Sequence, residues 1–359
     1  MKFFLFYHTL VSDWNHGNAH FLRGITSELI ARGHEVHVYE PRDSWSRETL
    51  IAEQGPAVID DFHRAYPTLT SSLYDPDLDL DQALDGADVV IVHEWNRTAL
   101  VQRIGQHRRE GGAYQLFFHD THHRAVTARE EMKAYDLSGF DGVLAYGEVL
   151  REIYLREGWA ARAWTWHEAA DARVFHPMPE IKRTRDLVWI GNWGDDERTA
   201  ELHRFLFQPV KALRLDAQVF GVRYPEMGFR ALADAGIEYG GWLPNFRVPE
   251  IFAQFRLTVH IPRLPYAREL RGIPTIRPFE ALACGIPLIS TPWEDAEGLF
   301  TPGRDYLVAH DEREMQKHLK ALLADKAMAR ELAEHGRRTI LARHTCAHRV
   351  DELLAICGG

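Results

Sequence analysis

The sequence predicts an α/β protein with two domains, each built on a parallel β-sheet. Its 359 residues suit two domains of ordinary size. Short apolar runs of strand length alternate with segments of helical period, and they do so in two successive series. A proline-rich stretch without periodicity, residues 171–179, separates the two series and reads as a linker.

The first forty residues establish the pattern. Residues 2–7 are an apolar run, and residues 21–32 carry apolar side chains at helical spacing. Gly33 ends that helix at the usual C-terminal glycine position, and residues 35–39 form the next apolar run. Strand, helix and strand in this order make a βαβ unit, which requires a parallel sheet with a right-handed crossover.

The rest of the chain repeats this alternation. Helices are expected at 149–157 and from 312 onward. Further strands are expected at 88–92, 114–118, 142–145 and 161–166, and then at 186–191, 217–221, 237–239, 257–261, 286–290 and 306–309. We therefore predict a Rossmann-like domain at 1–172, a second domain at 173–335, and a helix at 336–359 that packs back toward the first domain.

Composition limits the partners and the compartment. The net charge of −10 lacks the basic footprint of a nucleic-acid-binding protein. Cys284, Cys346 and Cys357 have no paired spacing, which argues for a reducing compartment and against a disulfide framework. We expect a cytoplasmic protein, since no small-residue cleavage site follows the first apolar run and no stretch reaches the roughly 18 residues of a transmembrane segment.

Residues 268–290 contain the clearest chemical pattern. Pro278 is suited to the first position of a helix, and residues 286–290 form a buried strand after it. The loop before Pro278 offers free backbone N–H groups at the positive end of the helix dipole, which suits a diphosphate. Glu280, on the first turn, can accept hydrogen bonds from the two hydroxyls of a ribose. The candidate diphosphate ligands are Arg271, Thr275, Ile276 and Arg277.

A less specific interpretation of the same residues stays open. Glu280 then only caps its helix, and Arg277 forms a surface ion pair.

Residues 279–290 resemble the nucleotide-binding signature of the group 1 (family four) glycosyltransferases, which have the GT-B fold. Residues 275–285 and 241–249 also look like those of CgeB-like proteins, named after a spore-maturation protein. The resemblance implies two Rossmann-like domains that face a central cleft, with Glu280 on the donor's ribose. It further implies sugar transfer with retention of configuration and without a metal or other cofactor.

The sequence departs from this family at one position. The family's pattern has another glutamate eight positions before the one that corresponds to Glu280. That earlier glutamate contacts the donor sugar. Gly272 stands there in this chain, and Glu269 is out of register. The identity of the donor sugar is therefore left unassigned.

Other loops supply further candidates for donor binding. A glycine-led turn starts at Gly191 after a predicted strand, and Arg198 follows it. Arg263 comes just after another strand end, and Gly17 with Asn18 lies in the first loop of the chain. In the resembling family such loops reach the donor's phosphates. The alternatives are an ordinary capped turn, a surface arginine and an ordinary tight turn.

Two strand ends of the first domain carry polar clusters. By resemblance, His119 lines the sugar pocket and stabilises the positive charge that develops on the ring, with Asp120 as its neighbour. His119 as a core histidine is one alternative, and a zinc site made by His119, Asp120 and either His122 or His123 is another.

The second of these clusters follows residues 88–92. His93, Glu94 and Asn96 are candidates for acceptor binding. The alternative is that Glu94 and Asn96 cap the next helix.

The sequence thus predicts an enzyme that transfers a sugar from a nucleoside diphosphate sugar to an acceptor, which can be a glycan, a lipid-linked molecule or a small molecule. Three other functions stay open at this point. They are a nucleotide-sugar epimerase or phosphorylase on the same fold, a non-catalytic nucleotide-sugar-binding protein, and a metal hydrolase that uses the His119 cluster.

Overall fold

The structure is a computed structural model and describes residues 1–358. Contacts divide it into two compact units. Unit 1 comprises Met1–Glu168 together with the chain from Cys346 onward, and unit 2 is Ala169–Thr345. The sequence placed its boundaries after residues 172 and 335, whereas the chain passes between the units at 168/169 and at 345/346.

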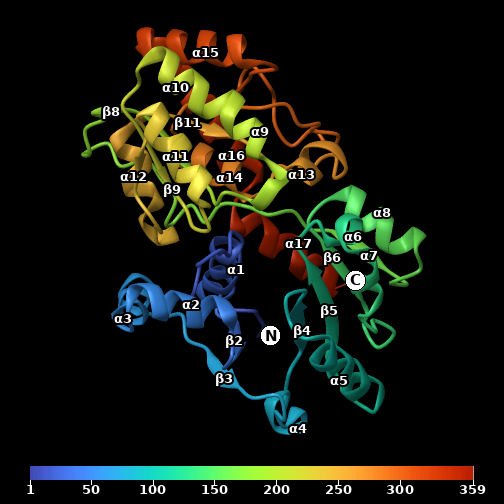
Figure 1. Cartoon of the computed structure of the whole chain (residues 1–359). Helices are drawn as coiled ribbons and strands as arrows, with labels where there is room; N and C mark the ends of the chain where they lie inside the picture. Colours follow the sequence, from blue (N-terminus) through green and yellow to red (C-terminus); the bar gives the residue numbers. More distant parts are fainter. Residues whose placement is uncertain (359) are drawn as a thin grey trace. The chain divides into compact units, whose positions relative to one another are not determined.

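Unit 1 is built on a parallel sheet with strand order β3-β2-β1-β4-β5-β6-β7 (Figure 1). Every strand expected in this unit is present. The short strand β3, which pairs with β2 at the sheet edge, was missed because Leu73 and Tyr74 stand between serines and Asp75-Pro76 and form no apolar run. The strands are β1 (Lys2–Phe6), β2 (Glu35–Pro41), β3 (Ser72–Tyr74), β4 (Val89–His93), β5 (Gln115–Asp120), β6 (Gly142–Ala145) and β7 (Ala163–Thr165).

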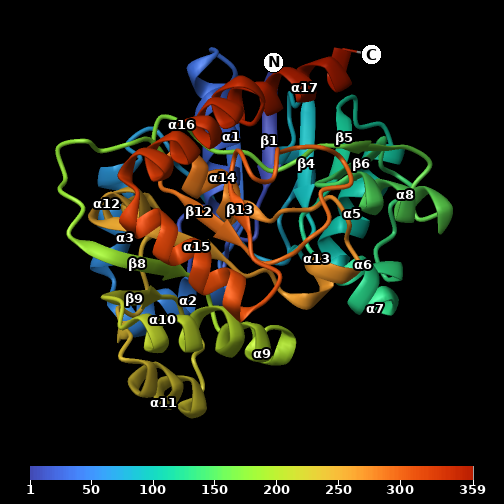
Figure 2. The same cartoon turned by 90° about the horizontal axis from the view of Figure 1, so that it is seen from above.

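The helices of unit 1 connect these strands, and one of them comes from the far end of the sequence. Figure 2 shows that last helix, α17, beside α1, and the two helices are in contact. Arg32 forms an ion pair with Asp351, and Trp166 Nε1 donates a hydrogen bond of 2.8 Å to the carbonyl oxygen of Arg349. The helices are α1 (Ala19–Ala31), α2 (Trp45–Gln54), α3 (Ala57–Ala65), α4 (Leu80–Ala83), α5 (Thr98–Arg109), α6 (Arg124–Thr127), α7 (Arg129–Lys133), α8 (Glu148–Arg156) and α17 (Cys346–Gly358).

Unit 2 has a second parallel sheet, with strand order β10-β9-β8-β11-β12-β13. Its strands are those that the sequence predicted, with small changes at their ends. They are β8 (Arg185–Ile190), β9 (Ala217–Phe220), β10 (Glu238–Tyr239), β11 (Phe255–His260), β12 (Leu288–Ser290) and β13 (Leu307–Val308).

Helices pack against this sheet and bury its apolar residues. Trp189 and Val259 of the sheet share one core cluster with Val210 of α10 and with Met315 and Leu319 of α15. The helices are α9 (Thr199–Leu202), α10 (Gln208–Leu213), α11 (Glu226–Ala235), α12 (Val248–Gln254), α13 (Leu264–Arg268), α14 (Ile276–Ala283), α15 (Glu312–Ala324) and α16 (Lys326–Arg343).

In each sheet the connections reverse direction at one point. The chain leaves β1 toward β2 on one side, while β4 pairs with β1 on the other. In unit 2 the same happens at β8, which lies between β9 and β11. Ligands of open α/β sheets bind outside the carboxyl ends of the strands at such a switch point. The fold therefore directs attention to the loops after β1 and β4, and after β8 and β11.

Helix α14 begins earlier than expected. The sequence placed its start at Pro278, but the helix starts at Ile276, so Pro278 lies within the first turn. Proline is tolerated there because the N–H groups of the first turn have no partner inside the helix. Thr275 precedes the helix with φ of 61°, a backbone region that β-branched residues rarely adopt.

Within residues 1–358 no helix combines the length and the apolar character that a membrane crossing requires.

We predict that the core of unit 1 depends on α17. Leu353 has no exposed surface, so Leu353→Ala should lower the free energy of unfolding of unit 1 by about 2–5 kcal/mol. Urea denaturation followed by tryptophan fluorescence measures this change. Leu341, which is 41% exposed on α16, is the control, and Leu341→Ala should stay within about 0.5 kcal/mol. Equal effects of the two substitutions would contradict the assignment of α17 to the core.

Candidate functional site

At the switch point of unit 2, two arginines close over one glycine. Gly194 lies in the turn after β8 with φ of 83°. A Cβ atom at this position would lie 2.8 Å from Nε of Arg198 and 3.2 Å from Nε of Arg263. Any larger residue would therefore have to displace both guanidinium groups as well as adopt a strained backbone. The glycine lets the two side chains approach the same turn.

Arg198 ties together the loops that follow β8 and β11. Its guanidinium lies over the ring of Trp189, 5.1 Å from the ring centre. It donates hydrogen bonds to the backbone carbonyls of Asn192 (2.5 Å), Trp193 (3.3 Å) and Ile261 (2.9 Å). These contacts hold its charge in place at the strand ends.

A third arginine adds its charge to the same place. Burial, followed by the charges of Arg263 and Arg277, lowers the pKa of Arg198 to about 9. Burial and the charges of Arg198 and Arg277 likewise lower the pKa of His260 to about 3, so this imidazole is neutral at pH 7. The charge of Arg277 thus acts on both Arg198 and His260, and the charge of Arg263 acts on Arg198.

Acidic partners offset only part of this charge. Arg263 forms an ion pair of 3.2 Å with Glu197, and Arg277 forms one with Glu280. Two carboxylates against three guanidinium groups leave a positive excess. An anion bound at this place would relieve the repulsion among the arginines.

The start of α14 borders this arginine cluster, which consists of Arg198, Arg263 and Arg277. Thr275 Oγ1 lies 3.4 Å from Nε2 of His260, whose Nδ1 is 2.9 Å from Oγ of Ser290. The first-turn N–H groups of α14, at Ile276 and its neighbour, have no partner within the helix and carry the positive end of its dipole. Three of the predicted donor ligands, Thr275, Ile276 and Arg277, therefore lie close to Arg198.

Glu280 is less accessible than expected. Its side chain has no exposed surface, and Nδ2 of Asn245 donates a hydrogen bond of 2.8 Å to one of its oxygens. Arg277 engages the other oxygen. A ribose can reach this carboxylate only if one of these two partners moves.

Arg271 and Gly272 lie in a different setting. The side chain of Arg271 is 66% exposed and pairs with Glu294 at 3.2 Å. Gly272 has φ of 92°, and a Cβ atom there would lie 2.7 Å from Oε1 of Glu297. The carboxylate of Glu297 thus lies where a side chain at position 272 would begin.

At the switch point of unit 1, four buried histidines form a row. His8 follows β1, His16 precedes α1, His93 ends β4, and His119 lies near the end of β5. Successive ring centres along the row are 5.7, 6.1 and 5.3 Å apart. Each ring is less than a tenth exposed. The sequence identified His93 and His119, but not that His8 and His16 stand beside them.

This histidine row is neutral and only partly hydrogen-bonded. Burial lowers the pKa of His119 and of His16 to about 3 and that of His8 to about 4. Neither ring nitrogen of His16 or His119 has a hydrogen-bond partner, and neither does Nε2 of His8. Buried polar atoms normally have such partners, so this is where a ligand or water would be expected.

His119 also lies among aromatic rings. Its ring centre is 4.9 Å from that of Trp166 and 5.9 Å from that of Phe21. The first ring is tilted by 63° and the second by 52°, so the imidazole is fixed by packing on two sides. This setting fits both a ligand-binding histidine and the core histidine considered from the sequence.

Asp120 and Glu94 are engaged inside unit 1. Asp120 accepts hydrogen bonds from Tyr154 Oη (2.7 Å) and from the backbone N–H of His122 (3.0 Å), while Glu94 pairs with Arg124. Burial raises the pKa of Asp120 to about 6. Burial and the charge of Asp120 raise that of Glu94 to about 8, against the opposing effect of Arg124.

Asn96 and the loop before α1 are held by hydrogen bonds. Nδ2 of Asn96 donates to the carbonyls of Phe6 and His93, at 2.8 Å each. Nδ2 of Asn18 donates to the backbone carbonyl of Thr121 at 3.2 Å, and the neighbouring Gly17 is exposed. These contacts link the ends of β1, β4 and β5.

The alternative zinc site does not form. In the part of the chain that the structure describes, no three His, Cys, Asp or Glu side chains are arranged to hold a metal ion. Both oxygens of Asp120 are engaged, one by Tyr154 Oη and the other by the backbone N–H of His122.

Unit 2 is similar to a known protein family. Residues 198–355, which cover most of unit 2 and most of α17, match the family model described as glycosyl transferase-like. No curated protein matches the sequence.

Solved structures match the whole chain at low sequence identity. Sucrose-phosphate synthase from Thermosynechococcus elongatus aligns over 99% of this chain and 98% of its own, with 14% identity and a TM-score of 0.68. An alpha-glucosyltransferase solved with UDP aligns over 100% of both chains, with 13% identity and a TM-score of 0.71. The chain has the GT-B fold.

A third GT-B structure supports this result. Anabaena HepE, solved with UDP and glucose, aligns over 99% of both chains with 12% identity and a TM-score of 0.68. The predicted fold of two Rossmann-like domains is confirmed.

We predict that unit 1 loses stability as the pH falls below about 6.5, because protonation of the buried histidines favours the unfolded chain. The stabilising effect of a neutral imidazole is complete above the unfolded pKa near 6.5 and is lost as the pH approaches 3 to 4. His16→Leu should reduce the slope by up to about 1.4 kcal/mol per pH unit.

Urea denaturation at several values between pH 7.5 and 4.5 measures this slope. His63→Leu, at an exposed position on α3, is the control and should leave the slope unchanged. An unchanged slope in His16→Leu would contradict the burial of a neutral imidazole.

Proposed function

We propose that the protein is a glycosyltransferase that uses a nucleoside diphosphate sugar as donor. The observation that carries the proposal is the arginine cluster beside the start of α14 in unit 2. Guanidinium groups bind phosphate oxygens through charge-assisted hydrogen bonds, and a helix N-terminus supplies further donors. The cluster lies outside the carboxyl ends of β8 and β11, where this type of sheet binds ligands.

The leaving group in such a transfer is the nucleoside diphosphate. Negative charge builds up on it as the bond to the sugar breaks, while positive charge develops on the sugar ring. Arg198 is held rigid by backbone carbonyls, so its charge is in place before the reaction begins. Preorganised charge of this kind stabilises the transition state without a cost for reorientation. Arg263 and Arg277 add to it, with Thr275 and Ile276 at the helix start.

Glu280 has a second part in the proposal. Its carboxylate is held between Arg277 and Asn245, and donor binding draws Arg277 toward the diphosphate. One oxygen of Glu280 is then released for the ribose hydroxyls. The strained backbone of Thr275 sets where α14 begins, and it thereby positions Arg277 and Glu280 relative to each other and to the diphosphate.

We propose that unit 1 binds the acceptor and supplies His119. A neutral imidazole with free nitrogens can accept a hydrogen bond and can stabilise positive charge on the sugar. We further propose that transfer retains the configuration at the anomeric carbon and needs no metal, as the resemblance to the group 1 enzymes implies. The similarity of residues 275–285 and 241–249 to CgeB-like proteins supports membership of that subgroup.

The partners and the compartment follow from charge and thiol chemistry. The net charge of −10 disfavours a nucleic acid as acceptor, although one of the similar alpha-glucosyltransferases was solved with DNA. The three cysteines form no disulfide with one another, which fits the reducing environment of the cytoplasm.

The first test is binding of UDP, the nucleotide present in several of the similar structures. Arg263→Ala and Arg277→Ala should each weaken UDP binding by about 10- to 100-fold, because a hydrogen bond to a charged group is worth about 1.5–3 kcal/mol. Isothermal titration calorimetry measures the affinity. Arg230→Ala, at a side chain that is 75% exposed on α11, is the control and should bind like the unmodified protein. If both cluster variants keep full affinity, the proposed donor site is wrong.

The second test separates catalysis from binding. His119→Ala should slow hydrolysis of UDP-glucose by about 100-fold or more while UDP affinity stays unchanged, since the residue acts on the reacting sugar. Nucleotide release, followed by chromatography, gives the rate. Hydrolysis at the normal rate would remove His119 from the mechanism. Conversion of the sugar without loss of nucleotide would instead identify an epimerase, and tight UDP binding without turnover would identify a binding protein.

A further inference from the structure

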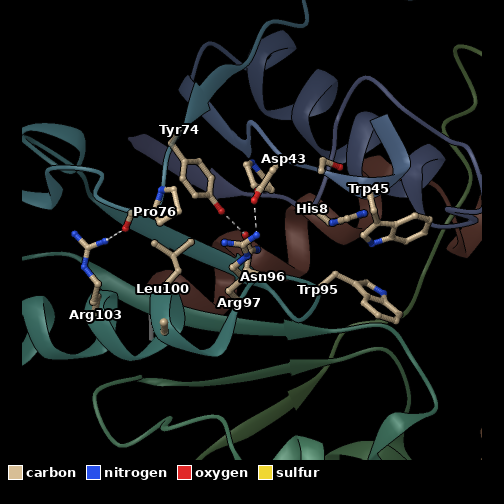
Figure 3. A pocket seen from close by; sticks show the side chains of 13 residues that line it. His8, Asp43, Trp45, Tyr74, Pro76, Trp95, Asn96, Arg97, Leu100 and Arg103 are labelled. Atoms are coloured by element: carbon tan, nitrogen blue, oxygen red, sulfur yellow. Dashed lines mark hydrogen bonds and ion pairs between the residues drawn. The ribbon is translucent and has the colours of Figure 1, made fainter. Parts of the chain in front are cut away.

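Unit 1 contains a pocket of about 180 Å³ at the carboxyl edge of its sheet. Its lining comes from the residues that follow β1, β2, β3 and β4, so it adjoins the switch point of this unit. Figure 3 shows His8, Trp45 and Trp95 together at one end of the pocket. Pro76 and Leu100 lie toward the other end.

The rings of His8, Trp45 and Trp95 form part of the pocket wall. His8 lies 4.9 Å from Trp45 with a tilt of 32°, and 6.5 Å from Trp95 with a tilt of 50°. Trp45 is 40% exposed, which is unusual for so large an apolar side chain. Its exposed indole therefore offers a ligand an apolar ring face.

The rim of the pocket is polar, and its charged side chains are engaged with neighbouring groups. Arg97 forms an ion pair with Asp43. Arg103 donates hydrogen bonds to the carbonyls of Pro76 (2.6 Å) and Leu78 (2.5 Å). These guanidinium and carboxylate groups can form hydrogen bonds with the hydroxyl groups of a ligand that carries no charge.

Two of the lining residues each have a buried polar atom without a hydrogen-bond partner, His8 at Nε2 and Ser44 at Oγ. His8 is 3% exposed, and its Nε2 makes no hydrogen bond. A wholly apolar ligand would leave this nitrogen unsatisfied, which costs about 1–3 kcal/mol. A ligand hydroxyl can satisfy it, because a neutral imidazole nitrogen either donates or accepts. The ligand should therefore combine apolar faces with hydroxyl groups at its edge.

We infer that this pocket binds a neutral sugar ring, and that the acceptor of the transfer is a saccharide. The inference rests on the proposed function, since it names the class of acceptor. A sugar ring places its C–H faces against Trp45 and Trp95 and its hydroxyls against His8 and the Asp43–Arg97 pair. His8 is also the first member of the histidine row that ends at His119, so a hydroxyl bound at His8 lies at the start of that row.

The test uses neutral methyl glycosides and disaccharides as probes. Saturation-transfer difference NMR should detect their binding to the full chain, with contacts on the ring C–H protons. Trp45→Ala should weaken binding by at least about tenfold, which corresponds to about 1.4 kcal/mol. Trp45→Phe, which keeps an aromatic face, should restore most of it. Phe229→Ala removes a similarly exposed ring (43%) from α11 of unit 2 and is the matched control.

The outcomes separate this inference from the proposed function. UDP binding, measured by calorimetry, should be the same in Trp45→Ala as in the unmodified chain. If UDP binds but no glycoside gives a signal, or if adenosine and simple phenols bind in place of glycosides, the saccharide pocket is wrong while the donor site stands. If glycosides bind and UDP does not, the pocket stands and the proposed transfer fails.

Discussion

The site in unit 2 depends on positively charged arginine side chains that the fold holds close together although they repel one another. The charges of Arg263 and of Arg277, at the start of α14, both act on Arg198 beside the ends of β8 and β11. Backbone carbonyls hold Arg198, and single carboxylates hold the other two. Gly194 makes the approach of two of them possible because it has no Cβ. Separating these charges would stabilise the fold. Their proximity is therefore what an anion-binding site would require.

Unit 1 has the opposite character at its own switch point. The side chains there are neutral imidazoles and aromatic rings, and burial keeps the pKa of His16 and His119 far below 7. At the pocket rim, Arg97 pairs with Asp43 and Arg103 is bonded to backbone carbonyls. The two units thus share an architecture but differ in electrostatics, which fits a charged nucleotide in one and an uncharged hydroxylated ligand in the other.

Most of the fold could be predicted from the sequence, and part of the site. Buried parallel strands are read from local apolar runs, which is why only β3 was missed. The resemblance of residues 279–290 led to α14, but its start at Ile276 depends on the unusual Thr275 backbone. Asn245 encloses Glu280, and His8 and His16 lie in the same row as His93. These contacts join segments that are distant in the sequence, so no local pattern predicts them.

The central claim is that unit 2 recognises a diphosphate through its arginine cluster. Comparison of UDP with uridine, by calorimetry at rising salt concentration, tests it most directly. The account predicts that UDP binds at least about 100-fold more tightly than uridine, and that the difference shrinks as salt screens the charges. Equal affinities for UDP and uridine, or a difference that salt does not change, would contradict it.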